Sequence, residues 1–355
     1  WEDAAGGGVT FKAFGTSSIM VGDDATGTID AANYNTALGV DVFAALTSGD
    51  NNVAVGYNAG AGITTGTLNT FIGGLAGDAT TTASDNTGVG AASMGGNTTG
   101  TRNTALGSDS LKVSTEGNDN TAIGKGSLAA NTTASNNTAV GKNSLTANTT
   151  GAQNTAVGQG AGESNTTGVS LVALGRQALE ANTEGDFNTA LGQRALFKNT
   201  TSDDNTAVGN QALGENTTGA RNTAVGADAL DANTTANNNT AVGRSSLGAN
   251  TTGTFNTASG RQALLSNTTG DNNVAVGGNA LYQNTTADDN TAVGAYALDA
   301  NTTGASNTAV GANALDANTT AANNTAVGKN ALKATTTGAV NVAVGSNALL
   351  TVITG

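Results

Sequence analysis

The chain has 355 residues, a formal net charge of −13, and no cysteine, histidine or proline. Without Cys and His it has no thiol nucleophile, disulfide, histidine general base or usual zinc ligand. Its negative charge opposes binding to nucleic acid or to an anionic membrane surface, and no apolar run approaches the roughly 18 residues that a membrane-spanning helix needs.

A five-residue motif, most often NTAVG, recurs every 17 residues without insertion or deletion, from residues 18–22 to residues 341–345. The chain therefore holds twenty copies of one unit. A fixed short period is typical of a solenoid, in which each unit buries its apolar face on its neighbours. We number the unit from 1 to 17, starting at the Asn of NTAVG, so that Asn205 is position 1 and Arg221 is position 17.

The repeat divides the chain into three parts. Residues 1–17 lie outside it, and we expect an N-terminal cap or a joining segment there. The first four copies, residues 18–85, are irregular, with Phe43 at position 9 and Phe71 at position 3, and we expect a wider shaft or a contact zone. Residues 86–355 form nearly uniform units, and the last unit stops in its middle, so we expect the polypeptide to continue.

Each coil is expected to contain two strands, NTAV and xALxA, with a turn at the Gly of position 5 and a corner at NTTG. A helix is disfavoured, because Gly costs about 1 kcal/mol in a helix interior and recurs in every unit. Positions 2 and 4 share one side of a strand, and we expect that side to face inward, with Leu at position 9 as a second anchor. The expected core residues are Val140, Leu145, Val208, Leu213, Val225, Leu230, Val293 and Leu298.

Two further positions have a structural interpretation. Position 5 is Gly in every copy, which indicates a positive φ or a close approach of another backbone; examples are Gly141, Gly209, Gly226 and Gly294. Position 12 is usually Asn, and its replacement by Leu46 and Ile63 indicates an inward side chain. Stacked asparagines at this corner are expected to form an amide ladder.

The fold class is therefore predicted as all-β, a parallel β-roll or β-solenoid of twenty 17-residue coils. One coil orders 17 residues, and the burial available within a single chain does not clearly offset that entropy. Position 3 should face outward in this scheme, yet it is almost always Ala. We therefore expect it to contact another chain in a parallel homo-oligomer, most simply a trimer, either intertwined or side by side. The predicted contact residues are Ala139, Ala207, Ala224 and Ala292.

Charged side chains fall at positions 6, 7, 10, 16 and 17, and these are predicted to be solvated. Two acidic pairs at a turn are candidates for a calcium site, namely Asp203 with Asp204 and Asp288 with Asp289. The repeat lacks the nonapeptide of calcium-loaded rolls, so solvated turn residues are the favoured interpretation. No other cofactor or metal is expected.

The motif NTAVG, with variants NVAVG at 52–56 and 341–345 and NTAIG at 120–124, resembles the SVAIG-type repeat of trimeric autotransporter adhesin heads of the YadA kind. The longer pattern NTAVG…AL…NTTG is similar to repeats of bacteriophage and bacterial tail-fibre proteins. The resemblance covers residues 18–355. It implies a left-handed parallel β-roll assembled as a trimer.

We expect a non-enzymatic structural shaft of an extracellular appendage or a phage tail fibre, whose tip binds a cell-surface glycan or protein receptor. One alternative is a bacterial adhesin that binds host matrix or glycans through its lateral face, where Phe187, Phe255, Tyr282 and Tyr296 are predicted to point outward. A second is an ice-binding solenoid. Such proteins array Thr on one flat face, whereas the adjacent Thr residues of NTTG should point in opposite directions.

Overall fold

The computed structural model describes residues 10–12, 18–22 and 31–350. These residues form strands, turns and loops; they contain no helix and hence none that could cross a membrane. The chain divides into two compact units, 1–171 and 172–355, each described by itself below. Of the expected cap at 1–17, only residues 10–12 are among those described.

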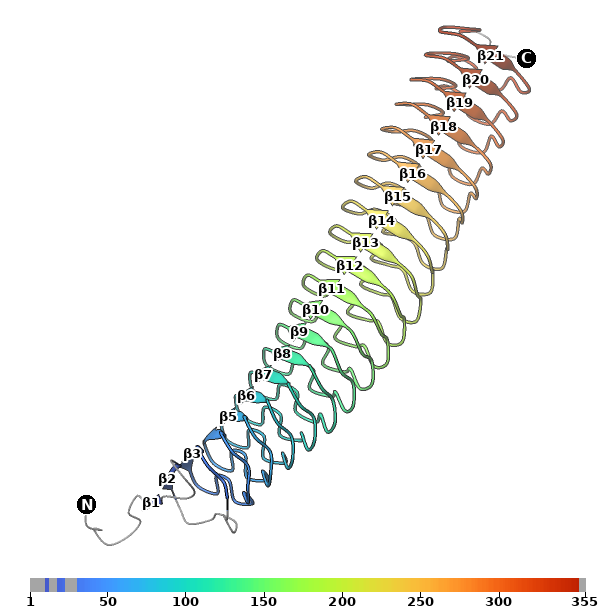
Figure 1. Cartoon of the computed structure of the whole chain (residues 1–355). Helices are drawn as coiled ribbons and strands as arrows, with labels where there is room; N and C mark the ends of the chain where they lie inside the picture. Colours follow the sequence, from blue (N-terminus) through green and yellow to red (C-terminus); the bar gives the residue numbers. More distant parts are fainter. Residues whose placement is uncertain (1–9, 13–17, 23–30, 351–355) are drawn as a thin grey trace. The chain divides into compact units, whose positions relative to one another are not determined.

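Every described coil contributes one short strand at positions 2–4 (Figure 1). The first unit contains β1 (Thr10–Lys12), β2 (Ile19–Gly22), β3 (Thr36–Gly39), β4 (Val53–Val55), β5 (Thr70–Ile72), β6 (Thr87–Val89), β7 (Thr104–Leu106), β8 (Thr121–Ile123), β9 (Thr138–Val140) and β10 (Thr155–Val157). The second unit contains β11 (Val172–Leu174), β12 (Thr189–Leu191), β13 (Thr206–Val208), β14 (Thr223–Val225), β15 (Thr240–Val242), β16 (Thr257–Ser259), β17 (Val274–Val276), β18 (Thr291–Val293), β19 (Thr308–Val310), β20 (Thr325–Val327) and β21 (Val342–Val344).

Within each unit the strands stack in parallel, each displaced from the last by one repeat. Thr206 of β13 lies opposite Thr223 of β14, for example, and Ala207 lies opposite Ala224. The one exception is β1, which pairs antiparallel with β2. The predicted fold class, an all-β parallel β-solenoid of 17-residue coils, is confirmed.

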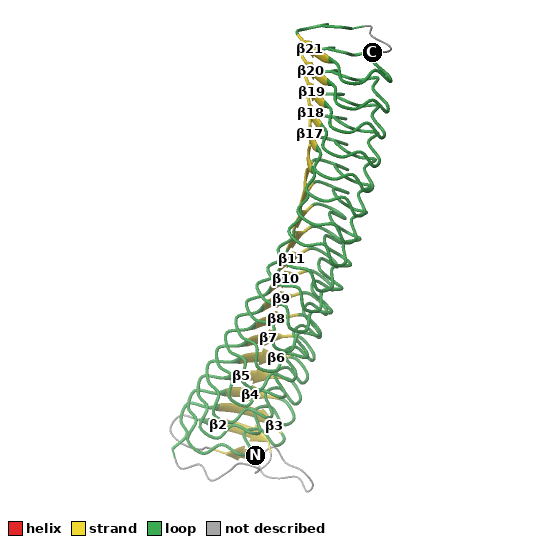
Figure 2. Ribbon diagram, turned by 90° about the vertical axis from the view of Figure 1, so that its right-hand side faces the viewer, coloured by secondary structure: helices red, strands yellow, loops and turns green. Residues whose placement is uncertain are grey.

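The expected second strand, at positions 7–11, is wrong: this segment is a series of turns (Figure 2). Positions 7 and 9 both have positive φ, as at Gln211 (56°) and Leu213 (52°), and such residues cannot continue an extended strand. The segment nevertheless bonds to the next coil, since the Leu213 N–H donates to the Ala229 carbonyl over 3.0 Å.

The predicted direction of the strand side chains is also wrong. Position 3 points inward: Ala139, Ala207, Ala224 and Ala292 are all fully buried, so they cannot contact another chain. Positions 2 and 4 point outward, and Val140, Val208, Val225 and Val293 are part-exposed rather than core residues. The other predicted core residues, Leu145, Leu213, Leu230 and Leu298 at position 9, are confirmed as buried.

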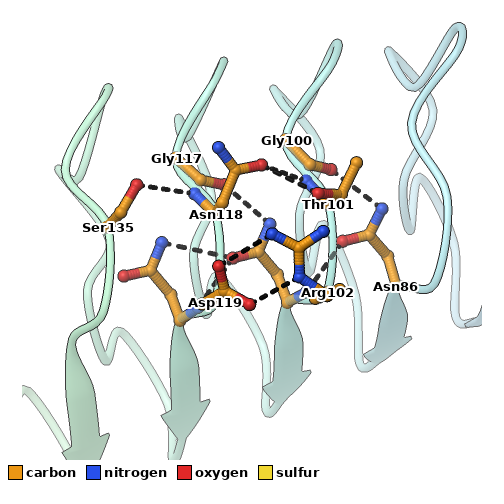
Figure 3. Close-up of polar contacts among 10 residues, drawn as sticks. Asn86, Gly100, Thr101, Arg102, Gly117, Asn118, Asp119 and Ser135 are labelled. Atoms are coloured by element: carbon orange, nitrogen blue, oxygen red, sulfur yellow. Dashed lines mark hydrogen bonds and ion pairs between the residues drawn. The ribbon is translucent and has the colours of Figure 1, made fainter.

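A buried asparagine at position 1, which the sequence analysis did not place inside, closes most of the described coils. Leu171 replaces it in one copy, and Nδ2 of Asn290 makes no such bond. The side-chain Nδ2 of Asn205 donates to the carbonyl of Gly219, 14 residues later in the same coil, over 2.9 Å. Its Oδ1 accepts the backbone N–H of Asn222 in the next coil, also over 2.9 Å. Figure 3 shows the same closure between Asn86 and Gly100. One amide therefore fixes the circumference of a coil and its spacing to the next.

The asparagines of position 12 form the expected ladder. Nδ2 of Asn216 donates to Oδ1 of Asn199 in the preceding coil, over 3.0 Å, and to the Gly219 carbonyl of its own coil, over 2.9 Å. The Gly219 carbonyl thus accepts amides from positions 1 and 12 together. These bonds satisfy polar groups in an interior where an unpaired donor or acceptor would cost about 1–3 kcal/mol.

In the irregular coils a large side chain at one inward position is matched by glycine at a neighbouring inward position, so that the interior stays filled. Phe71 fills position 3, and a Cβ on Gly77 at position 9 of the same coil would lie 2.5 Å from its ring. A Cβ on Gly88, at position 3 of the next coil, would lie 2.9 Å from the same ring. Phe43 at position 9 is accommodated by Gly60 of the next coil, whose Cβ would lie 3.2 Å from its ring. Both phenylalanines are fully buried, so they belong to the core.

Glycine at position 5 meets both expected conditions. Gly141, Gly209, Gly226 and Gly294 have φ between 135° and 138°. A Cβ on Gly209 would lie 2.5 Å from the carbonyl oxygen of Gly226 in the next coil. A side chain here would be strained and would also push two coils apart.

We predict that Gly209→Ala destabilises the second unit by about 2–4 kcal/mol, through backbone strain and the contact with Gly226. Urea unfolding followed by circular dichroism measures the loss. Gly278→Ala is the matched control, because a Cβ at Gly278 meets no atom within 4 Å, and it should change stability by less than about 0.5 kcal/mol. Equal effects of the two substitutions would contradict the prediction.

A second prediction concerns the asparagine closure. Asn222→Ala removes the donor to the Ala236 carbonyl and the acceptor of the Asn239 N–H, and we expect a loss of about 2–4 kcal/mol. The control is Asn210→Ala, since the Asn210 amide is exposed and makes only a 3.4 Å bond to the Gln193 carbonyl. Similar unfolding midpoints for the two variants would show that the buried amide does not close the coil.

Candidate interaction surface

The outward face of the stacked strands carries two columns of side chains, at positions 2 and 4. Position 2 is Thr in most copies, Val in four and Ile19 in the first, and position 4 is Val, Leu or Ile in every copy except the one with Ser259. The position 4 side chains are all part-exposed or exposed, and examples of the more exposed ones are Leu38 (49%), Ile123 (36%) and Val293 (37%). An apolar column therefore lies on the surface of each unit, interrupted in the second unit by Ser259.

This face carries no charge. Positions 2 and 4 supply forty side chains across the twenty copies, and none is acidic or basic. At the 11% charged residues of the whole chain, about four would be expected. Contiguous apolar surface without charge is typical of a contact surface rather than of one exposed to water.

The acidic pairs proposed for calcium lie beside this face, at positions 16 and 17. Oδ1 of Asp203 accepts the backbone N–H of Asp186, and Oδ1 of Asp288 accepts that of Asp271, both over 2.8 Å. Their neighbours Asp204 and Asp289 are exposed, with φ of 60°. Within residues 10–12, 18–22 and 31–350, no three Asp, Glu, His or Cys side chains gather where they could hold a metal ion. Asp203 and Asp288 therefore have a structural explanation, and calcium binding stays a prediction.

Other polar residues at position 16 act in the same way as Asp203. In Figure 3, Oδ1 of Asn118 accepts the Thr101 N–H over 2.8 Å, and the Asn118 N–H donates to Oγ of Ser135 over 3.0 Å. At position 17, Arg102 pairs with Asp119 of the next coil, with Nε to Oδ1 at 2.6 Å. This exposed pair contributes at most about 1 kcal/mol.

Position 10 departs from the expected solvation. Asp231, Asp299 and Asp316 are only part-exposed, and burial raises the pKa of each carboxyl above its usual value of 3.8. The neighbouring charge of Asp316 raises the pKa of Asp299 further. Lys333 lies 3.9 Å from Asp316 and partly opposes the rise in its pKa. Ionisation of these three position 10 carboxyls at neutral pH therefore lowers the stability of the folded chain.

The aromatic residues considered for glycan binding are mostly exposed. Phe187, Phe255 and Tyr296 have exposed fractions of 59%, 60% and 49%, whereas Tyr282 is only part-exposed. Phe187 and Phe255 occupy the same position of the unit but lie 68 residues, or four coils, apart. They stand as single exposed aromatics, which are common on protein surfaces.

No protein-family model matches the sequence, and no curated protein is significantly similar to it.

The raised carboxyl pKa values predict a pH-dependent substitution effect. The folded state binds a proton at Asp299 more readily than the unfolded chain does. Its contribution to stability is therefore fully present below pH 3.8 and is lost as the pH rises through the folded-state pKa. Asp299→Asn should raise the melting temperature at pH 7, by roughly 1–2 °C, and should give no increase at pH 3.

Differential scanning calorimetry at both pH values measures this effect. Asp289→Asn is the control, because Asp289 is exposed at position 17. A gain at pH 3 as large as at pH 7 would show that the effect of Asp299→Asn does not come from its charge.

Proposed function

We propose that this chain is a non-enzymatic structural shaft of an extracellular appendage or phage tail fibre, built from parallel copies of itself, most simply three. The shaft would present a tip that binds a glycan or protein receptor on a cell surface. The observation that supports this proposal best is the uncharged outward face of positions 2 and 4, repeated in every coil.

The proposed contact replaces the one expected at position 3. Covering a part-exposed valine contributes about 0.5–1 kcal/mol, a small amount for one coil. Because the same side chain recurs in each coil, the contribution is multiplied along the whole array. A face repeated in this way suits a partner with the same period, and a second copy of the chain has that period.

The interior supports a structural role rather than a catalytic one. Positions 1, 3, 8, 9 and 12 are filled by Asn, Ala, Ser and Leu, whose interior polar groups are mostly bonded to one another and to the backbone. The chain also lacks His and Cys, the commonest general base and the strongest nucleophile of enzymes.

Ice binding is the second candidate, because the outward face carries a column of Thr at position 2. The adjacent column, at position 4, consists of Val, Leu and Ile with one Ser. Its side chains therefore differ in length from coil to coil, as Leu174, Val225 and Ser259 do. A surface made uneven by side chains of different length fits a protein partner better than the flat lattice of ice. Thermal hysteresis in a sample of the chain that sediments as a monomer would favour ice binding.

The proposal predicts that Val208→Lys with Val225→Lys abolishes self-association, because two charges would be buried in the contact. The side chains are part-exposed in a single chain, so the circular dichroism spectrum should be unchanged. The control is Asn210→Lys with Ala227→Lys, which places the same charge in the same two coils at position 6, where Lys125 and Lys142 occur naturally.

Sedimentation velocity of the wild type and both variants decides the outcome. The wild type and the control should sediment as an oligomer, and the valine variant as a folded monomer. A folded wild-type monomer would refute the proposal.

A further inference from the structure

The two borders of the uncharged face carry opposite charges. Position 6 follows the strand, and every charged residue at position 6 in the described part of the chain is basic. These residues are Lys125, Lys142, Arg176, Arg244, Arg261 and Lys329. All six are exposed, and none forms an ion pair with another described residue. We call this row the basic border.

Positions 16 and 17 precede the strand and form the opposite border. In the second unit their charged residues are six aspartates and Arg221. The aspartates are Asp186, Asp203, Asp204, Asp271, Asp288 and Asp289. We call this row the acidic border. In the first unit the charged residues at these two positions are also mainly acidic: three aspartates, Asp50, Asp85 and Asp119, and one cation, Arg102.

A solvated surface would not separate the signs in this way. The turn side of the coil, at positions 10 and 11, mixes both signs and forms ion pairs there, as between Lys198 and Glu215 and between Lys333 and Asp316. The strand face has only cations among the described charges of one border and mainly aspartates on the other, where Arg102 pairs with Asp119. No cation of the basic border forms an ion pair within the described chain, although the pKa of the Asp109 carboxyl is lowered by its hydrogen bond to Lys112 and, to a lesser extent, by the charge of nearby Lys125. This difference points to a partner outside the chain.

Symmetry determines which borders meet when two copies join through this face. A rotation about a shared axis parallel to the solenoid axis keeps the copies parallel and turns the facing strands in opposite directions, so the basic border of one copy lies against the acidic border of the next. A two-fold axis perpendicular to the solenoid makes the copies antiparallel and places like borders together. Like charges in contact cost free energy, and opposite charges select register and partner.

We propose that the acidic border of one copy docks on the basic border of the next, and that this pairing selects parallel rings of copies over antiparallel pairs. In the second unit the groups tested below are Arg244 and Arg261, which follow β15 and β16, and Asp204 and Asp289, which precede β13 and β18. In a ring without axial shift each lies two strands, or roughly 10 Å, along the axis from an opposite charge, a distance over which charges interact at low salt. This inference rests on the self-association proposed above, and it adds which surfaces meet and with what polarity.

Charge reversal of each border tests the pairing. Arg244→Glu with Arg261→Glu reverses part of the basic border. Asp204→Arg with Asp289→Arg reverses part of the acidic border at a position where Arg221 occurs naturally. Asp203 and Asp288 are left intact, because their carboxylates bond the backbone of the preceding coil. The four-site variant combines both reversals.

Each two-site variant should raise the dissociation concentration at least roughly tenfold at low salt, and by less than about threefold at 0.5 M salt, because salt screens exposed charges. The four-site variant should assemble like the wild type. When refolded together from denaturant, it and the wild type should form separate oligomers, since every mixed contact places like charges together. Native mass spectrometry of the mixture measures the sorting.

The control matched to the basic-border variant changes the net charge by the same amount, four negative charges, but on the turn side. Ala249, Ser266, Gln283 and Ala334 all lie at position 11, where Lys198 and Glu215 occur naturally, and are changed together to Glu. This control should assemble like the wild type. Two-site variants that behave like the control, or free mixing of the four-site variant with the wild type, would overturn the pairing while leaving self-association intact. A wild-type monomer would instead refute the self-association.

Polarity is read separately with fluorescent labels, because the chain has no cysteine of its own. Thr201→Cys and Thr303→Cys place labels at position 14, six coils apart. In a parallel assembly, labels at the same site lie close together in both variants. Energy transfer only between a Thr201→Cys copy and a Thr303→Cys copy would show antiparallel copies and overturn the inference.

Discussion

The amide of position 1 is the polar constraint that most coils share, and Leu171 is the one apolar replacement among the described copies. Asn205 bonds a carbonyl of its own coil through Nδ2 and the next coil through Oδ1. An inserted or deleted residue would move the position 15 carbonyl away from that amide and leave buried groups unpaired, at about 1–3 kcal/mol each. This closure explains a period that stays at 17 residues while most outward side chains change. Position 5 of successive coils lies so close together that only glycine fits there.

A closed coil of fixed circumference has a fixed interior volume, and the sequence respects it. Most coils divide this volume between a small residue at position 3 and Leu at position 9. Where Phe71 takes the first of these places, Gly77 takes the second and Gly88 follows in the next coil. Close packing in the interior makes such exchanges necessary, because an added ring without a matching loss forces strain. The first four copies therefore differ in composition and retain the packing of the others.

The period, the turn glycines, the leucine column and the amide ladder of position 12 could all be predicted from the sequence, because each depends on residue type at a fixed spacing. The direction of the strand side chains could not be obtained from alternation alone. Alternation shows that positions 2 and 4 share a side, and their apolar valines favour an inward direction. In the structure position 3 points inward instead, and it is Ala in all copies but those with Met20, Phe71 and Gly88. The exchange of Phe71 with Gly77 was the available signal. The second strand was predicted wrongly because Leu rarely adopts a positive φ, although Asn, Asp and Gly at position 7 already indicated one.

The leucine column also explains why the outer surface can vary while the fold does not. Leu213 and its equivalents hold φ near 50°, which costs about 1–2 kcal/mol for a residue with a Cβ. Complete burial of the side chain contributes about 2–3 kcal/mol, but only when the coils above and below are in place. The conformation is thus stable in the stack and strained in a lone coil, so each coil depends on its neighbours. Because the fold rests on inward residues, the outward ones at positions 2, 4, 6, 16 and 17 are largely free to be selected for contacts with other molecules. An uncharged face between borders of opposite sign is what selection for a specific contact, rather than for solubility alone, would leave on such a surface.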